Sequence, residues 1–199
     1  LKGIFPGLEA NFAFDISVSS SHENRAELLE LLGDVADCSD HITYSVNEGN
    51  GLKFTLLKNG NATGITFRGI PNGHEFTSFI MGLYNVAGPG QALDGETMGR
   101  IKALDAPTDM QIFVSLSCTL CPELVIAAQH IAALNPNVRA EAYDLNHFPA
   151  LKETYNVMSV PCLVLNGEKV LFGKKSISQL LDTLEQQEQK SRTSDRPEG

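Results

Sequence analysis

The sequence predicts an α/β protein assembled from two copies of one structural unit. First, β-like apolar runs alternate with apolar residues at helical spacing. Second, residues 18–28 align with residues 114–124, and each segment ends a β-like run and opens a helix-like one. Third, Asn59-Gly60 and Asn166-Gly167 each join two apolar runs, which is typical of hairpins. A repeat with a period of about half the chain indicates two units, since a solenoid needs three or more short repeats.

The second copy has the clearer pattern. Residues 110–116 form a short apolar run that suits a buried strand, and apolar residues recur at helical spacing from Leu124 to Leu134. Asn135-Pro136 ends that helix. The later predicted elements are strand 138–144, helix 149–155, a hairpin of 160–165 and 169–172, and an amphipathic helix over 177–184. The predicted order is therefore β-α-β-α-β-β-α.

The first copy follows a shortened version of this plan. Its predicted elements are strand 11–19, helix 23–36, strand 42–46, strands 52–58 and 63–68, and helix 73–87. The connection after residue 46 is too short to hold a full helix. We therefore expect the first copy to lack one helix of the second.

Composition changes suggest where the units begin and end. Gly88-Pro89-Gly90 breaks a helix before a short connecting helix over 96–104. Residues 185–199 are polar throughout and cannot bury enough apolar surface to offset the entropy of ordering. The expected division is a domain without redox cysteines at 1–90, a connecting segment at 91–108, a domain with the cysteine pair at 109–186, and a polar linker or tail at 187–199.

Charge and composition exclude several classes of function. The net charge is −9 with no basic stripe, so we expect no nucleic-acid partner. No apolar run reaches the roughly 18 residues of a membrane span, so we expect no membrane partner. Four cysteines are too few for a disulfide-stapled secreted scaffold, which favours a cytoplasmic location. Because the chain opens on Leu1 without a signal-like segment, we interpret it as an excised or processed piece of something longer.

Cys118 and Cys121 form a Cys-x-x-Cys where an apolar strand meets an amphipathic helix. The positive end of a helix stabilises a thiolate, which lowers the pKa of Cys118 from the free value of about 8.5. We therefore expect Cys118 to be the nucleophile. Cys121, three residues later, is placed to attack a mixed disulfide at Cys118 and release the product. Pro122 fits the first turn of such a helix.

Pro161 opens a strand that otherwise has the pattern of a central one. Proline cannot donate a ladder hydrogen bond, so its presence there indicates a special backbone, such as a cis peptide bond. A cis Pro161 would abut the dithiol. Val160 before it would leave its backbone free to pair with an extended substrate segment.

The remaining cysteines and the histidines suggest no catalytic site. Cys162 shares one strand face with Val160 and Val164, so we expect it to be buried, and Cys38 is interpreted as a bystander. A structural zinc site needs four ligands, and only these two scattered cysteines remain, so we expect no metal. The five histidines share no ligand spacing. A non-enzymatic module that binds zinc or a partner remains an alternative.

These motifs resemble the thioredoxin/glutaredoxin family, and more closely the N-terminal domain of the alkyl hydroperoxide reductase flavoprotein subunit. The resemblance covers most of residues 10–186 and includes the tandem arrangement. Its motifs are Ser-Leu-Ser-Cys-x-x-Cys-Pro at 115–122, Leu-Asn-Pro at 134–136, Asn-Val-Met-x-Val-Pro at 156–161 and Gly-His-Glu-Phe-Thr-Ser at 73–78. The sequence departs from the family at Cys162, where a small apolar residue is usual. The resemblance implies two fused thioredoxin-like domains, the second carrying the Cys-x-x-Cys.

The resemblance also implies a function. In this family the tandem unit relays electrons from a flavoprotein, thioredoxin-reductase-like portion to the disulfide of a two-cysteine peroxiredoxin. FAD and NAD(P)H are then expected on a missing or separate reductase domain, since no Gly-x-Gly-x-x-Gly follows a strand here. The expected cofactor content of this chain is none. A general, glutaredoxin-like protein disulfide oxidoreductase is the alternative enzyme.

Site residues follow from the same resemblance. The matching motif places Glu75 near the dithiol as proton acceptor for Cys121, although ordinary helix-start chemistry also explains an acid in a first turn. The residues expected to contact the substrate are Thr119, Leu120, Val160 and Pro161. In the first copy His22 and Arg25 replace the two cysteines, so that copy is expected to serve as scaffold, docking surface and source of Glu75.

Overall fold

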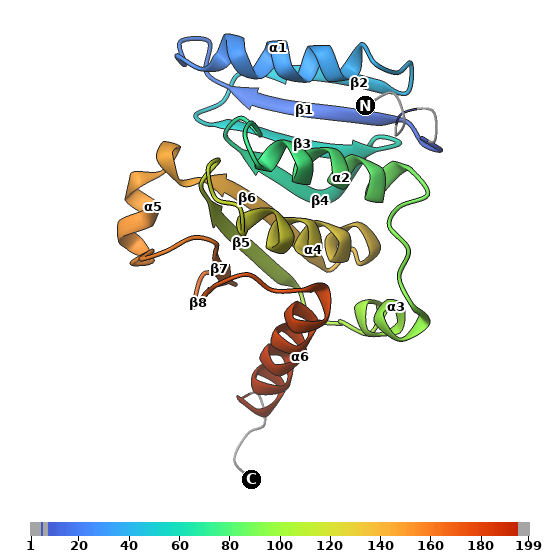
Figure 1. Ribbon diagram of the computed structural model, residues 1–199, viewed down its shortest axis with the longest axis vertical. Coiled ribbons are helices and arrows are strands. Elements are labelled where there is room, and N and C mark those ends of the chain that lie inside the picture. Colours follow the sequence, from blue (N-terminus) through green and yellow to red (C-terminus); the bar gives the residue numbers. More distant parts are fainter. Residues whose placement is uncertain (1–4, 6–7, 195–199) are drawn as a thin grey trace.

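One mixed sheet of eight strands runs through the computed structural model, which describes residue 5 and residues 8–194 (Figure 1). The strands are β1 (Phe12–Val18), β2 (Ile42–Asn47), β3 (Leu52–Lys58), β4 (Asn61–Arg68), β5 (Thr108–Val114), β6 (Val138–Asp144), β7 (Cys162–Leu165) and β8 (Lys169–Phe172). Their order across the sheet is β2-β1-β3-β4-β6-β5-β7-β8. Both Asn-Gly turns are confirmed, and Asn59 and Asn166 have the positive φ that such hairpins require.

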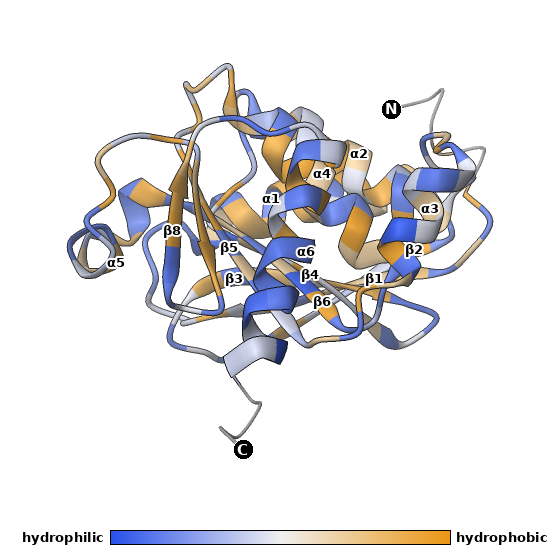
Figure 2. Ribbon diagram, turned by 90° about the horizontal axis from the view of Figure 1, so that it is seen from below, coloured by the Kyte–Doolittle hydropathy of each residue, from blue (hydrophilic) through white to orange (hydrophobic). Residues whose placement is uncertain are grey.

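Helices cover mainly one face of this sheet. They are α1 (Arg25–Ala36), α2 (Glu75–Ala87), α3 (Gly95–Lys102), α4 (Cys121–Leu134), the 3-10 helix η2 (Leu145–His147), α5 (Pro149–Thr154) and α6 (Ile177–Ser194). The buried apolar side chains of α1, α2 and α4 belong to one large core cluster with residues of both halves of the sheet. Figure 2 shows the orange, hydrophobic stretches of α2 and α4. A helix follows β6 in the second half, whereas a short turn over 48–51 follows β2 in the first, as the sequence predicts.

The predicted repeat is confirmed by the pairing of the strands. In the first half β1 pairs with β2 in parallel and with β3 antiparallel, and β4 pairs antiparallel with β3. In the second half β5 pairs with β6 in parallel and with β7 antiparallel, and β8 pairs antiparallel with β7. The two halves therefore have one and the same topology.

The halves are joined by the parallel pairing of β4 with β6. Ile65 lies opposite Ala140 and Phe67 opposite Ala142, and all four side chains belong to the large core. The last strand of the first copy thus pairs with the second strand of the second copy. Neither of these two strands is an edge strand, and the sheet is continuous between the copies. This pairing sets α2 of the first half directly against α4 of the second (Figure 1).

A second, smaller core lies on the opposite face of the second half. Its buried members are Phe113, Tyr143, Val157, Cys162 and Val164, and they pack against residues of η2 and α5. Along β5, Met110 and Ile112 belong to the large core whereas Phe113 belongs to the small one. The alternation of a strand therefore assigns neighbouring side chains to different cores.

The structure differs from the sequence-based expectation at the polar C-terminal segment. Residues 187–194, expected as linker or tail, continue α6, and residues 195–199 lie outside the described residues. The first half of α6 buries Leu180, Leu181 and Leu184 in the large core, and polar contacts to α3 and the residues after it add to this packing. Arg100 of α3 pairs with Asp182 at 2.5 Å and Glu185 at 2.8 Å, and the Ala106 N–H donates to Glu188 at 2.8 Å. A composition argument misses these contacts because their partners lie some 80 residues away.

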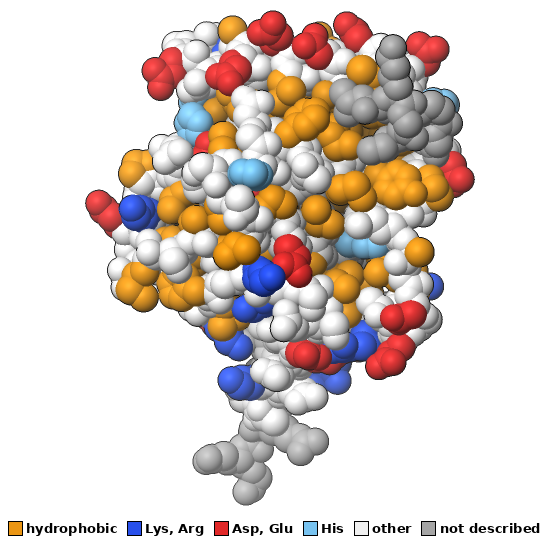
Figure 3. Space-filling model, viewed as in Figure 1, with side chains coloured by type: hydrophobic (Ala, Val, Ile, Leu, Met, Phe, Trp, Pro, Cys, Tyr) orange, Lys and Arg blue, Asp and Glu red, His pale blue; other side chains and the backbone are white. Residues whose placement is uncertain are grey.

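In Figure 3, acidic side chains gather along the end of the molecule occupied by α1, and basic ones lie mostly over the second half. The charge is therefore unevenly spread over this face. Of the helices in the described part of the chain, none has both the length and the apolar character that crossing a membrane requires.

Gly64 of β4 tests how tightly the two halves are joined. Gly60 and Gly64 both have positive φ, at 81° and 78°, but a Cβ on Gly64 would lie 2.8 Å from the Val138 oxygen whereas one on Gly60 meets nothing within 4 Å. Backbone strain is therefore similar, and only Gly64→Ala forces β4 away from β6. We expect Gly64→Ala to lower the free energy of unfolding by about 1–3 kcal/mol more than Gly60→Ala in chemical denaturation. Equal losses would contradict a close β4–β6 contact.

Candidate active site

Cys118 and Cys121 are joined by a disulfide in the connection from β5 to α4. Their Cα atoms are 5.6 Å apart, a usual separation for bridged cysteines. The Cys118 N–H donates to the Ser115 carbonyl at 3.0 Å, so the chain turns just before the pair. The helix α4 itself begins at Cys121, with Leu120 as its N-cap and Pro122 in its first turn, so Cys118 lies just before the N-terminus of the helix. Cys118 lies in the turn that leads into the helix.

The two sulfur-bearing residues differ in exposure. Cys118 is half-buried, whereas Cys121 has 0% of its surface exposed and packs within the large core. An incoming disulfide therefore reaches Cys118 first. Cys121 is positioned to react with the sulfur of Cys118 and not with a partner from solvent.

Pro161 borders the disulfide as the sequence predicts. The Val160–Pro161 peptide bond is cis. The Cys118 Sγ lies 3.9 Å from the carbonyl oxygen of Val160, and the Gly173 N–H donates to the Pro161 carbonyl at 3.0 Å. Because the hairpin of β7 and β8 holds Pro161 through Gly173, the backbone at Val160 is fixed beside the sulfur.

Exposed apolar side chains occur between the two cysteines and shortly before Pro161. Leu120 is 51% exposed between the two cysteines, and Met158 is 75% exposed three residues before Pro161. Thr119 is exposed and Val160 is half-buried. Leu120 and Met158 are thus exposed apolar side chains, a feature that suits contact with a protein substrate.

Glu75 is fully buried at the first position of α2. The His74 N–H donates to the Leu116 carbonyl at 3.0 Å, which holds the start of α2 against the segment that leads to Cys118. The Ser78 hydroxyl lies against both the Glu75 carboxylate and its backbone carbonyl. Among the described residues, the Oε1 atom of Glu75 is buried without a hydrogen-bond partner. A helix-start acid normally faces solvent, so ordinary N-terminal chemistry does not account for this burial.

Burial raises the pKa of Glu75 from 4.5 to about 7. The hydrogen bond from Ser78 opposes this rise, and the nearby charge of Asp144 adds to it. A carboxyl with a pKa near neutrality can both accept and return a proton at physiological pH. A buried thiol such as Cys121 needs such a group to form its thiolate.

The other two cysteines lie apart from this site. Cys162 is free and fully buried in the small aromatic core on the other sheet face, as expected, and burial raises the pKa of its thiol to about 11. Cys38 is free and exposed, and its sulfur donates to the Asp34 carbonyl at 3.2 Å. Within the described ranges, no group of three or more His, Cys, Asp or Glu side chains is arranged to hold a metal ion.

The first half retains the strand-to-helix junction without its cysteines. Arg25, at the position that corresponds to Cys121, donates through Nη1 to the Val18 carbonyl at 3.1 Å. His22, at the position of Cys118, lies near His147 of the second half, with 6.4 Å between the ring centroids. In this junction Arg25 therefore links the start of α1 to the end of β1, and His22 faces the second half.

Asp144 is a buried residue that the sequence argument did not select. It ends β6 with 3% of its surface exposed. A signal was present, because Ala140 and Ala142 point into the large core and the alternation predicts that Asp144 points the same way. A carboxylate at a core-facing strand position is unusual without a specific role.

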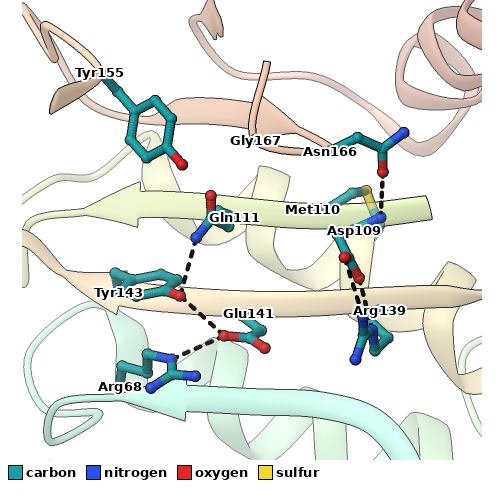
Figure 4. Close-up of a pocket in the computed structure, with 10 residues that line it drawn as sticks. All are labelled: Arg68, Asp109, Met110, Gln111, Arg139, Glu141, Tyr143, Tyr155, Asn166 and Gly167. Carbon is teal, nitrogen blue, oxygen red and sulfur yellow. Dashed lines mark hydrogen bonds and ion pairs between the residues drawn. The ribbon is translucent and has the colours of Figure 1, made fainter. Parts of the chain in front are cut away.

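A cavity of about 370 Å³ lies on the opposite face of the sheet (Figure 4). Its four charged lining residues are paired with one another, Arg68 with Glu141 at 2.8 Å and Arg139 with Asp109 at 2.6 Å. Gln111 donates to the Tyr143 hydroxyl, which donates to Glu141. The polar groups of this cavity thus satisfy one another, and the disulfide is on the other side of the sheet.

Comparisons with known proteins agree with this geometry. A family model described as a thioredoxin domain matches residues 108–185. The chain is 35% identical over 183 residues to the F subunit of alkyl hydroperoxide reductase from Pseudomonas aeruginosa. The matched region covers 91% of this chain and 35% of the relative. The corresponding protein of Staphylococcus aureus is 32% identical over 185 residues, covering 92% of this chain and 36% of the relative. The chain thus spans about a third of the length of these relatives.

Solved structures give the same result at the level of the domain. The NTD_N/C domain of alkyl hydroperoxide reductase AhpF from Enterococcus faecalis superposes with a TM-score of 0.87 at 35% identity, over 92% of this chain and 95% of that one. A protein disulfide oxidoreductase from Aeropyrum pernix superposes with a TM-score of 0.81 at 20% identity, over 92% of this chain and 88% of that one, which shows the fold alone.

The fold and the disulfide site define a disulfide oxidoreductase of two fused thioredoxin-like units. More narrowly, the chain belongs to the family of the N-terminal tandem domains of the alkyl hydroperoxide reductase AhpF.

The burial of Glu75 predicts a pH dependence of stability. The folded-state pKa of about 7 exceeds the ordinary 4.5, so the native state holds this proton more tightly than the unfolded chain. The stabilisation is complete below about pH 4.5 and is lost as the pH rises through about 7, a change of about 3 kcal/mol at 1.36 kcal/mol per pH unit. The Glu75→Gln variant should not show this loss. The free energy of unfolding of the variant minus that of the parent chain should therefore increase from pH 5 to pH 8.

Denaturation of the disulfide form at both pH values measures this difference. Glu30→Gln, a change at an exposed glutamate of α1, is the matched control and should follow the parent chain. An unchanged pH dependence in Glu75→Gln would show that Glu75 does not titrate near neutrality.

Proposed function

We propose that this chain reduces the disulfide of a two-cysteine peroxiredoxin with its Cys118–Cys121 dithiol and is re-reduced by a flavoprotein disulfide reductase. The observation that carries the proposal is the pair itself, in which a half-buried Cys118 lies over a fully buried Cys121 beside the Val160 carbonyl. Membership in the AhpF family of alkyl hydroperoxide reductases supports the choice of partner.

The first step is attack by the Cys118 thiolate on one sulfur of the partner disulfide. A bond forms between Cys118 and that sulfur, the partner S–S bond breaks, and the electron pair leaves on the second partner sulfur, which takes up a proton. The substrate segment lies along Val160 and Pro161, with Thr119 and Leu120 at its border. The segment would pair with the backbone of Val160, whose carbonyl oxygen lies 3.9 Å from the Cys118 Sγ.

The second step releases the reduced partner. Glu75 accepts the proton of the Cys121 thiol, and the resulting thiolate attacks Cys118 Sγ. The Cys118–Cys121 bond forms, the mixed disulfide breaks, and the partner sulfur that Cys118 had attacked leaves as a thiolate and takes up the proton held by Glu75. Two electrons have then moved from the dithiol to the partner. The partner has gained two protons, one from Glu75 and one from the solvent, and the solvent had received one proton when Cys118 ionised. The buried Glu75 has the pKa of about 7 that this transfer requires.

Re-reduction runs the same exchange in reverse with a donor dithiol. We assign FAD and NAD(P)H to the reductase that supplies this dithiol, and none to this chain. We also assign the relay to the cytoplasm, where a reduced Cys-x-x-Cys is maintained.

The decisive experiment is a stoichiometric transfer. The chain is reduced with dithiothreitol, freed of the reductant, and mixed with an oxidised two-cysteine peroxiredoxin, and the thiols of both proteins are counted by alkylation and mass spectrometry. We expect one disulfide reduced for each Cys118–Cys121 disulfide formed. Equal rates with oxidised insulin would favour a general disulfide oxidoreductase. No transfer to either protein, with metal retained after purification, would favour the non-enzymatic alternative.

Single cysteine variants should separate the two roles. Cys121→Ser should accumulate a mixed disulfide with the peroxiredoxin through Cys118, because the resolving thiol is gone. Cys118→Ser should form none, because Cys121 is fully buried. Non-reducing electrophoresis with mass mapping measures both. The exposed Cys38→Ser is the matched control and should transfer electrons at the rate of the parent chain. Trapping through Cys121 would reverse the assignment.

The apolar surface beside Cys118 should determine partner affinity. Leu120→Ser and Met158→Ser each remove an exposed apolar side chain that a bound partner would cover. We expect each change to raise the KM for the peroxiredoxin about tenfold, with kcat little changed, since partial burial of such a side chain contributes about 1–1.5 kcal/mol. Tyr44→Ser changes an exposed side chain of β2, at the far edge of the sheet, and serves as control. An equal effect of Tyr44→Ser would place the docking surface elsewhere.

A further inference from the structure

A second cavity, of about 450 Å³, lies between α4, the start of α6 and the connection from α2 to α3 (Figure 1). This volume is within the range of sites that bind small molecules. The greater part of its wall is apolar and consists of Ala92, Leu93, Ile126, Ala127 and Ile177. The cavity therefore offers a surface against which an apolar molecule can pack.

His130 is the buried polar side chain of this wall, with 5% of its surface exposed. None of the described residues forms a hydrogen bond with its imidazole ring. Burial lowers the pKa of His130, so the ring is neutral at physiological pH and has one donor and one acceptor nitrogen. A buried polar group without a partner costs free energy, and an apolar side chain would be more stable at this position. The ring thus has hydrogen-bonding capacity that the fold itself does not use.

The other polar side chains of the wall have partners. The Gln91 side-chain oxygen accepts a hydrogen bond from Asn85 Nδ2 at 2.9 Å. The Ser176 hydroxyl accepts the Gln179 N–H at 3.2 Å at the start of α6. Within the described part of the chain, His130 is therefore the polar group of this cavity that remains available to a ligand.

The charges at the cavity favour a neutral ligand. Glu123 contributes to the wall, and its carboxylate pairs with Lys174 at 3.7 Å. Since Lys174 compensates Glu123, little attraction remains for a cation. A carboxylate ligand would lie near the negative Glu123, and the neutral His130 would give it no compensating charge.

This cavity is separate from the dithiol. Cys121 begins α4 and packs within the large core. His130 follows nine positions later, which at about 100° per residue places it on the opposite side of the helix. A ligand in the cavity would therefore leave the dithiol side of α4 free.

We propose that the cavity is a binding site for a small neutral molecule of the phenol class, whose hydroxyl forms a hydrogen bond with the ring of His130. A hydroxyl can donate or accept, so it suits either nitrogen of a neutral imidazole. The apolar ring of the ligand packs against Leu93, Ile126 and Ile177. This inference goes beyond the proposed function and does not depend on it.

Three matched probes test the chemistry of the site. The full chain in its disulfide form, labelled with nitrogen-15 in its histidine rings, is titrated by NMR with 4-ethylphenol, ethylbenzene and 4-ethylbenzoate. We expect 4-ethylphenol to bind and to shift the ring nitrogens of His130. Ethylbenzene, without the hydroxyl, should bind about five- to tenfold more weakly, and 4-ethylbenzoate more weakly still. The inference is overturned if 4-ethylphenol does not bind at millimolar concentration, or if 4-ethylbenzoate binds more tightly.

Two variants test the location. His130→Leu removes the imidazole and keeps an apolar side chain, so it should weaken binding of 4-ethylphenol about five- to tenfold and leave that of ethylbenzene nearly unchanged. Ala127→Leu adds bulk to the buried wall and should abolish binding of both probes. His41→Leu and Ala150→Leu, at exposed positions away from the cavity, are the matched controls and should bind as the parent chain does.

A separate measurement shows that these variants are folded. Each reduced variant should exchange with hydroxyethyl disulfide at the rate of the parent chain, since none of the changes touches the dithiol site. Unchanged affinity for 4-ethylphenol in folded His130→Leu and Ala127→Leu would place the bound probe elsewhere and overturn the inference. Loss of affinity in these two variants with normal exchange would support it.

Discussion

The parallel pairing of β4 with β6 is the interaction on which the rest of the structure depends. It merges two four-stranded sheets into one, and both halves then share a single large core. The small Ala140 and Ala142 opposite Ile65 and Phe67 fit this pairing beneath the helices. Because β4 leads into α2 and α4 leads into β6, the pairing also sets α2 against α4. The start of α2, with Glu75, therefore reaches the segment that carries Cys118.

The two halves share one topology but differ in the functional residues that they carry. The second half holds the cysteine pair, and the first half holds a fully buried carboxyl, Glu75, at the start of α2. At the junction of β1 and α1, a hydrogen bond from Arg25 to Val18 occupies the place of a disulfide. The copy without redox cysteines is part of the same core, because its helix α2 packs against α4, the helix that begins at Cys121.

Burial separates the chemistry at this site into an exposed and a protected part. Cys118, Leu120 and Met158 are accessible and suit the encounter with another protein. Cys121, Glu75 and Asp144 are withdrawn from water, where charge interactions are stronger and the carboxyl holds its proton to about pH 7. Cys118 is therefore the more accessible residue of the pair, whereas Cys121 and the carboxyl of Glu75 are enclosed by protein.

The sequence by itself determined the α/β class, the repeat, both Asn-Gly hairpins, the cysteine pair and the cis proline, because each depends on local propensity or short spacing. Only the tertiary structure decided which strands and helices join the two halves and which polar side chains are buried. It continued α6 to Ser194, with Glu188 accepting a hydrogen bond from the Ala106 N–H, began α4 at Cys121, and buried Asp144 at the end of β6. These features depend on contacts between residues far apart in the chain, which local patterns do not encode.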